Sequence, residues 1–381
     1  MKFVYYSVVL NHHQAHLADE LARRLGDDFR FVELKSSEGE SKGDIQDFSN
    51  RPYLLQAWKN DRNFNAAMAL AKSADVCVFA SNESLPFQIE RMKLGLLSFE
   101  MSERWLKKGV WSILSPRLLR NLYNHYLFSW EKKPLYKLCC SAFAANDQYF
   151  MHTFLGKCFK WGYFTRIENF DIVNCIKNKS TDVFTIMWCS RFVDFKHPEI
   201  PVKLAYQMKN SGLKFHIDMF GDGYLRPKIE AITAKLDLID VISFKGSVNN
   251  EIVRQEMRQH HMFLFTSDKR EGWGVVANEA MSNGCLLVAA NEIGSIPFLV
   301  KDMKTGIIYQ NGNVEDLYKR IHEVIYNPSL MSSIILNAFD YMRDIWSPSR
   351  AVSNLLSLSE ALLENVDFKI ESGPCSLATP I

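Results

Sequence analysis

The amino-acid sequence predicts an α/β protein made of two successive doubly wound domains. Short apolar runs alternate with amphipathic stretches along the whole chain, as in parallel sheets whose strands are joined by crossover helices. The chain has 381 residues, which exceeds the roughly 250–300 at which one hydrophobic core stops growing. Residues 166–181 are polar and follow neither the helical nor the strand period, so we expect the interdomain linker there.

The first domain, residues 1–165, is expected to open with a strand, a polar turn and a helix. Leucines recur every four residues after the first apolar run, and Gly26 then follows as a C-terminal helix stop. The strand candidates of this domain are the runs 3–10, 29–34, 76–80, 94–99 and 138–143.

The second domain, residues 182–345, repeats the alternation, with helical patterns such as 314–325 between its strands. Residues 346–366 hold a last helix, from about Ser349 to Glu364. Residues 367–381 are rich in Ser, Pro and Gly and are expected to form a disordered tail. The strand candidates are 185–189, 215–220, 241–245, 262–265, 286–290 and 306–309.

The composition excludes several classes of protein. A formal net charge of +2 does not describe a general polyanion binder. The eight cysteines are scattered without metal-ligand spacing, which is typical of a reducing cytosol. No run approaches the ~20 apolar residues that span a bilayer, and the run 3–10 is too short for a signal segment. We therefore expect a cytoplasmic protein.

The segment EGWGVVANE, from Glu271 to Glu279, is the most informative for chemistry. It follows a predicted strand and opens a helix that begins near Val275. Gly272 and Gly274 let the backbone approach a ligand closely, and the free N–H groups of a helix start suit an anion such as a sugar diphosphate. Glu271 would lie beside the sugar, and Glu279 could accept from ribose hydroxyls. By themselves, two glutamates at a helix start fit a solvated, charged face equally well.

Two glutamates separated by seven residues in this setting resemble the signature of the family-four retaining glycosyltransferases, or glycosyl transferases group 1. The resemblance covers about residues 183–310. It implies the GT-B fold, in which two Rossmann-like domains face a central cleft and the C-terminal helix crosses back to the first domain. It also implies that Glu271 contacts the transferred hexose and Glu279 the ribose. The other donor-binding residues that it implies in this turn are Gly272, Trp273, Gly274 and Val275.

The segment CSRFVDFK, residues 189–196, directly follows the first predicted strand of the second domain. It is similar to the family's arginine and lysine pair, which implies that Arg191 and Lys196 neutralise the departing diphosphate. Fixed cations at that position lower the barrier without a metal. The family usually has a glycine after its lysine, and this chain has His197. Taken in isolation, the segment fits two cations on a solvated loop better.

Two glycine turns support the same fold. Residues 220–223 (FGDG) resemble the family's glycine turn near the nucleotide, although such turns also occur for purely steric reasons. Residues 245–248 (KGSV) fall where relatives cradle the base, largely through backbone groups. The donor contacts that these turns imply are Gly221, Gly223, Gly246 and Val248.

On the acceptor side the resemblance is looser. The turn 11–14 (NHHQ) follows the first strand, where many relatives carry a glycine pair. His12 and His13 could bond a phosphate or an acceptor hydroxyl, and one of them could carry a proton. The alternative is a polar helix start with Asn11 as its cap.

Further candidates lie after the run 94–99. Ser102 and Glu103 could orient an acceptor hydroxyl, and an ion pair between Glu103 and Arg104 is the simpler alternative. Residues 104–137 hold eight lysines and arginines against the single acidic Glu131, interleaved with aromatic residues. Such a segment could lie on an anionic membrane and suit a lipid-linked acceptor, or it could be a solvated helical insertion. The sequence contains no nucleic-acid recognition module.

The sequence lacks an Asp-x-Asp triplet, a ligand-spaced His or Cys cluster and a triphosphate-binding loop. We therefore expect no cofactor, no metal and no ATP chemistry. The resemblance implies a retaining transferase that moves a hexose-type sugar from a nucleotide-diphosphate sugar, with a UDP-sugar favoured, to a glycan or lipid-linked acceptor. Bacterial surface polysaccharide assembly at the inner face of the cell membrane would fit such an enzyme. The alternatives are a sugar-nucleotide epimerase and a non-catalytic nucleotide-sugar-binding regulator.

Overall fold

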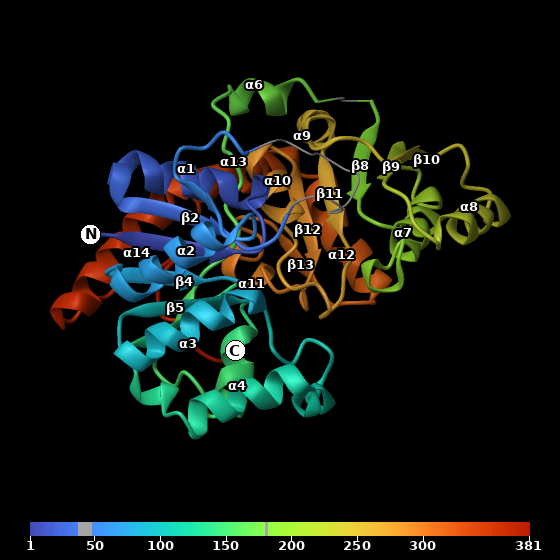
Figure 1. The fold of residues 1–381 in the computed structure, drawn as a ribbon. Helices are drawn as coiled ribbons and strands as arrows, with labels where there is room; N and C mark the ends of the chain where they lie inside the picture. The colour runs from blue at the N-terminus through green and yellow to red at the C-terminus, as the bar shows by residue number, and fades with distance from the viewer. Residues whose placement is uncertain (37–47, 180–181) are drawn as a thin grey trace. The chain divides into compact units, whose positions relative to one another are not determined.

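The computed structural model describes residues 1–36, 48–179 and 182–381, and these form two compact units (Figure 1). The first unit comprises Met1–Arg166 and Ile345–Ile381, and the second comprises Ile167–Asp344. Each unit is built on one parallel β-sheet with helices as crossovers, so the predicted pair of doubly wound domains is confirmed.

The sheet of the first unit has seven strands in the order β3-β2-β1-β4-β5-β6-β7, all parallel. The inner strand β1 is buried along its whole length, which is why its sequence begins with a continuous apolar run. The strand order reverses between β1 and β4, where open α/β sheets bind ligands. The strands are β1 Phe3–Ser7, β2 Phe29–Glu33, β3 Leu54–Gln56, β4 Val76–Phe79, β5 Ser98–Ser102, β6 Leu135–Cys139 and β7 Cys158–Lys160.

The helices of the first unit include the last helix of the chain, α14, which packs against α1. Arg24 near the end of α1 donates to the hydroxyl of Ser349 at 2.9 Å. The expected return of the C-terminal helix to the first domain is therefore present. The helices are α1 His12–Leu25, α2 Asp61–Ser73, α3 Leu85–Leu94, α4 Pro116–Tyr126, α5 Ala144–Phe150 and α14 Pro348–Glu364, and a short 3-10 helix, η3, spans Val110–Leu114.

The sheet of the second unit has six parallel strands in the order β10-β9-β8-β11-β12-β13. Its order reverses between β8 and β11. The strands are β8 Phe184–Cys189, β9 Phe215–Phe220, β10 Ile242–Gly246, β11 Met262–Phe265, β12 Leu286–Ala290 and β13 Ile307–Tyr309. The helices are α6 Ile172–Lys177, α7 Glu199–Lys209, α8 Arg226–Lys235, α9 Asn250–Gln259, α10 Val276–Ser282, α11 Ile296–Leu299, α12 Val314–Ile325 and α13 Pro328–Asp344.

Two strand predictions are displaced. The run 94–99 begins at the last residue of α3, which Gly95 ends in the left-handed region at φ 67°, and β5 starts only at Ser98. The run 138–143 continues past β6 into a turn. In both places one apolar run crosses an element boundary, so hydrophobicity alone misplaces the strand. The strands β3 (LLQ) and β7 (CFK) were missed because each has only two apolar residues, whereas the equally short β13 (IIY) is apolar throughout.

The prediction of a disordered tail is wrong for residues 375–378. The N–H of Cys375 donates to Lys160 O at 2.7 Å, the Lys160 N–H donates to Ser376 O at 2.8 Å, and the N–H of Ala378 donates to Cys158 O at 2.9 Å. The tail thus covers the edge strand β7, whose outer backbone groups would otherwise be unpaired. Amino-acid composition could not predict that the tail pairs with β7.

The predicted linker 166–181 also contains regular structure. The unit boundary falls after Arg166, and α6 lies within the segment as part of the second unit. A six-residue helix is too short to show its period in the sequence. Residues 180–181 lie outside the described residues.

Candidate functional site

The predicted catalytic residues of the second unit lie on the loops that follow β8 and β11, where the strand order reverses. The β8 loop carries Arg191 and Lys196, and the β11 loop carries Glu271. The ammonium of Lys196 forms an ion pair with Oε2 of Glu271, and the hydroxyl of Ser267 donates to the same oxygen at 3.0 Å. The structure therefore brings Lys196 and Glu271 into contact, and it leaves Arg191 exposed on the same loop as Lys196.

This ion pair is largely shielded from water. The side chains of Lys196 and Glu271 are 12% and 14% exposed. Among the described residues, Oε1 of Glu271 has no hydrogen-bond donor, and the ammonium of Lys196 has three N–H groups. Both groups consequently keep hydrogen-bonding capacity for a ligand while they hold each other in place.

His197 occupies the position at which the family usually has a glycine. Its backbone adopts the left-handed region, at φ 48° and ψ 56°, which glycine adopts without strain. Its ring nitrogens lie 3.1 Å from Glu199 Oε1 and 3.2 Å from Asp268 Oδ2, so that it joins the β8 loop to the β11 loop. The hydrogen bond to Glu199, assisted by that to Asp268, raises the pKa of His197 above its ordinary value.

This contact predicts a pH-dependent stability. Because the pKa of His197 is higher in the folded state, its stabilisation is complete below 6.5, the ordinary value, and is lost as the pH rises above it. The fall in the thermal midpoint above that pH should be smaller in His197→Asn, since asparagine tolerates the left-handed region but does not titrate. Differential scanning calorimetry over that pH range measures the difference. An equal fall in the thermal midpoint of the wild type and the variant would contradict this role of His197.

The glycine turn after β9 is shaped by backbone packing. A Cβ on Gly221 would lie 1.9 Å from the carbonyl oxygen of Ser190, and one on Gly223 would lie 2.5 Å from that of Phe192. Both glycines have positive φ, 116° and 155°. The N–H of Phe192 also donates to Asp222 O at 2.9 Å. This turn therefore holds the loop that carries Arg191.

We predict that Gly221→Ala destabilises the second unit by more than about 3 kcal/mol, because the new methyl group meets backbone that cannot move aside. Gly312→Ala is the matched control, since Gly312 also has positive φ, 74°, but has no atom within 4 Å of the added Cβ. The control should lose only the about 1–2 kcal/mol of a left-handed residue. Chemical denaturation measures both values, and equal losses would show that the close approach is unimportant.

The turn from Gly272 to Val275 is anchored from inside the unit. The indole of Trp273 is buried, and its N–H donates to Asn278 Oδ1 at 2.9 Å. Gly274 has φ 80°, and a Cβ there would lie 2.2 Å from the ring of Phe265. A contact of Trp273 with the nucleotide-sugar donor would therefore come from its backbone. Its side chain serves to position the turn.

The remaining residues that are predicted to contact the nucleotide-sugar donor are Glu279 and those of the two glycine turns. Glu279, buried in α10, accepts from the side-chain amide of Asn250 at 2.8 Å. The N–H of Gly221 donates to the carbonyl of Gly246 at 2.7 Å, which joins the turns after β9 and β10. Val248 lies in the loop between β10 and α9 and is partly exposed.

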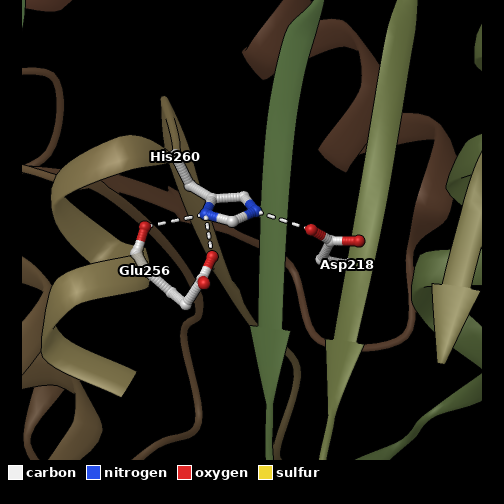
Figure 2. Close-up of side chains that lie close together, drawn as sticks. All are labelled: Asp218, Glu256 and His260. Carbon is white, nitrogen blue, oxygen red and sulfur yellow. Dashed lines mark hydrogen bonds and ion pairs between the residues drawn. The ribbon is translucent and has the colours of Figure 1, made fainter. Parts of the chain in front are cut away.

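Sequence reasoning missed a cluster of titratable side chains in the second unit (Figure 2). Nε2 of His260 lies 3.2 Å from Asp218 Oδ2, and its Nδ1 lies 2.7 Å from the backbone oxygen of Glu256 and 3.6 Å from the carboxylate of Glu256. Lys245 also pairs with Asp218, at 3.2 Å. The four-residue spacing of Glu256 on α9 and His260 at the C-cap of that helix was the available signal.

The geometry of this cluster favours a structural role. Both nitrogens of His260 are engaged, on opposite sides of the ring, and Asp218 also faces Lys245 and His216. Burial alone would raise the pKa of Asp218, but its hydrogen bonds to His260 and Lys245 outweigh burial and lower it. The cluster joins β9 and β10 to the end of α9.

In the first unit, a pocket of about 530 Å³ lies at the carboxyl ends of β4 and β5. Ser102 and Glu103 line it, and His12 and His13 do not. The lining also includes Gln14 of α1, Tyr163, and residues of η3 and α4. The structure thus separates the two pairs of predicted acceptor-side residues.

The predicted ion pair between Glu103 and Arg104 is wrong. Glu103 pairs with Lys107 at 2.9 Å, and Arg104 pairs with the buried Asp147, also at 2.9 Å. Neighbouring side chains in a turn point apart, whereas Lys107, four residues on, comes within reach. Ser102 Oγ accepts from the ammonium of Lys137 at 2.7 Å.

Of the two histidines after β1, His13 is not a cationic ligand. Asn11 caps α1 as the alternative interpretation had it, with its side chain accepting from the N–H of His13 at 3.1 Å. Burial, reinforced by the nearby ring of His12, lowers the pKa of His13 to about 3. His13 is therefore neutral at physiological pH and offers only hydrogen bonds.

The basic segment 104–137 packs on the first unit with only part of its apolar residues. Trp105, Leu118 and Trp130 are buried. Leu106 and Leu135 are buried as well, and eight apolar residues on η3 and α4 and in the loop that follows are exposed: Val110, Trp111, Leu114, Leu119, Tyr123, Tyr126, Leu127 and Phe128. Within the described part of the chain, no helix combines the length and apolar character needed to cross a bilayer.

Comparisons with known proteins agree with this geometry. Residues 174–340 match the family model described as glycosyl transferases group 1, so the resemblance noted in the sequence is confirmed there. The D-inositol 3-phosphate glycosyltransferase of Streptomyces bingchenggensis is 28% identical over 115 residues, which are 30% of this chain and 25% of that protein. The matches span only 25% to 36% of the length of the first curated relatives.

Several solved structures are similar over nearly the whole chain. A glycosyltransferase from Rickettsia africae aligns with a TM-score of 0.67 at 15% identity, covering 95% of this chain and 98% of that one. Anabaena HepE in complex with UDP and glucose aligns with a TM-score of 0.65 at 16% identity, covering 94% and 99%. These likenesses confirm the predicted GT-B fold.

Proposed function

We propose that this chain is a retaining glycosyltransferase that moves a hexose-type sugar from a nucleotide-diphosphate sugar to a glycan or lipid-linked acceptor. The observation that carries the proposal is the contact between Lys196 and Glu271 at the β8–β11 reversal, within the segment that matches the family. The relatives reported above are glycosyltransferases, which lends no support to an epimerase or a regulator. A UDP-sugar is favoured because HepE binds UDP and glucose on the same fold.

In this proposal Lys196 and Arg191 stabilise the negative charge that develops on the leaving diphosphate. Glu271 receives a hydroxyl of the transferred sugar on its unoccupied Oε1, while Lys196 and Ser267 hold its Oε2. Glu279 accepts from the ribose. Both glutamates are thereby engaged in binding, which favours front-face attack with a donor phosphate oxygen as the proton acceptor. The donor is held by these side chains without a metal.

The exposed apolar residues of η3 and α4, together with the cations of segment 104–137, support contact with an anionic membrane. This would place the enzyme at the inner face of a bacterial cell membrane, in surface polysaccharide assembly. Co-sedimentation of the chain with anionic but not with neutral vesicles tests the contact, and equal binding to both would contradict it.

Thermal unfolding with a panel of UDP-, GDP- and ADP-sugars tests the donor site. A ligand that binds only the folded chain raises its midpoint by mass action, and we expect the shift with a UDP-sugar. Product analysis with and without an acceptor then separates transfer from epimerisation. No shift with any member of the panel would overturn the proposal.

A further inference from the structure

The pocket of the first unit has an excess of positive charge. Five cationic residues line it against two carboxylates, Glu100 and Glu103. Glu100 pairs with Lys137 at 2.6 Å, and Glu103 pairs with Lys107 at 2.9 Å. Arg104 pairs with Asp147. The carboxylates of the pocket are therefore already neutralised by other groups.

Three cations of the lining have no carboxylate partner among the residues that the structure describes: Lys108, Arg117 and Arg120. Arg117 and Arg120 are three residues apart on α4, so they lie on one face of that helix. Two guanidinium groups on one face, with an ammonium beside the same pocket, suit a multiply charged oxyanion better than a single carboxylate.

A buried polar atom points independently to a ligand. Gln14 lines the pocket and is 8% exposed, and its Nε2 donates to Ser7 Oγ at 3.1 Å. Its Oε1 is buried and has no hydrogen-bond partner among the described residues. An unsatisfied buried acceptor costs roughly 1–3 kcal/mol, and a ligand hydroxyl would remove that cost. Among the described residues, the pocket thus offers three cations without a carboxylate partner and one buried acceptor atom without a donor.

We propose that this pocket binds an acceptor that carries a phosphate or pyrophosphate, with Arg117, Arg120 and Lys108 on the phosphate and Gln14 on a hydroxyl. The inference rests on the proposed function and names the chemical class of its acceptor. The phosphate can belong to a soluble sugar phosphate or to a lipid-linked one. The exposed Trp111 and Leu114 precede α4 in the chain and would lie close to the tail of a lipid carrier.

Calorimetric titration of inorganic pyrophosphate into the full chain, with the donor site saturated by UDP, tests the pocket. Arg117→Gln/Arg120→Gln should weaken pyrophosphate binding at least about tenfold. Arg62→Gln, at an exposed arginine of α2 outside the pocket, should leave it unchanged. Because both pocket arginines are exposed, the variant should keep the wild-type melting temperature. Arg117→Lys/Arg120→Lys keeps the charge and should show a smaller loss.

The outcomes separate the two proposals. The phosphate pocket is wrong and the donor site stands if UDP binds but pyrophosphate does not. The same conclusion follows if pyrophosphate binds Arg117→Gln/Arg120→Gln as tightly as Arg62→Gln. If UDP does not bind while pyrophosphate binding still depends on Arg117 and Arg120, the pocket stands and the proposed function fails. Vesicles of phosphatidylcholine with undecaprenyl phosphate should displace pyrophosphate if the phosphate is lipid-linked. No displacement by them assigns it to a soluble sugar phosphate.

Discussion

Glu271→Gln is expected to lower the turnover number for sugar transfer by about 10²- to 10³-fold. Glutamine keeps the shape of the side chain but removes the charge that pairs with Lys196, so that the sugar hydroxyl loses an ionic acceptor. Release of UDP and transfer of labelled sugar measure the effect. The thermal midpoint serves as a check that the fold is intact.

The control is Glu251→Gln, at an exposed glutamate in the first turn of α9. It should transfer sugar at the wild-type rate. Undiminished transfer by Glu271→Gln would remove Glu271 from the mechanism and, with it, the main support for the proposed donor site.

Lys196→Met should also lower turnover by about 10²- to 10³-fold, because it removes a cation from the leaving diphosphate. It also leaves Glu271 as a shielded carboxylate whose remaining side-chain donor is Ser267. Since Lys196 and Glu271 act together as an ion pair, the double variant Lys196→Met/Glu271→Gln should lose hardly more activity than either single variant.

The matched control for this prediction is Lys209→Met. Lys209 lies at the surface and pairs with Asp237, away from the β8 and β11 loops. Its removal should not alter turnover. If the losses of the two single variants at the site instead multiplied in the double variant, Lys196 and Glu271 would act independently.

The elements that sequence reasoning located well were those with a complete period. The apolar runs of β1, β11 and β12 are buried along their length, so hydrophobicity alone marks them. The last helix shows its period over four turns and was placed within one residue of α14. The strands β3 and β7 have only two apolar residues each and show no such signal.

Polar partners were predicted less well. The predicted partner of Glu103 was Arg104, but Glu103 pairs with Lys107, because a side chain four residues away is nearer than the adjacent one. The network of Asp218, Glu256 and His260 joins residues up to 42 positions apart, and the local spacing of Glu256 and His260 does not indicate that Asp218 is their partner. His197 was recognised as a departure, but its left-handed backbone became visible only in the structure.

The sequence by itself determined the class of each domain, the loops that hold the proposed donor site and the identity of the charged residues in those loops. These properties follow from local periodicity and from the backbone freedom of glycine. Only the tertiary structure decided that Lys196 meets Glu271, that Gly221 lies against Ser190, and that, among the described residues, three cations of the pocket lined by Gln14 have no carboxylate partner. These contacts depend on the order of strands in a sheet, which long-range packing sets and which no local period reports.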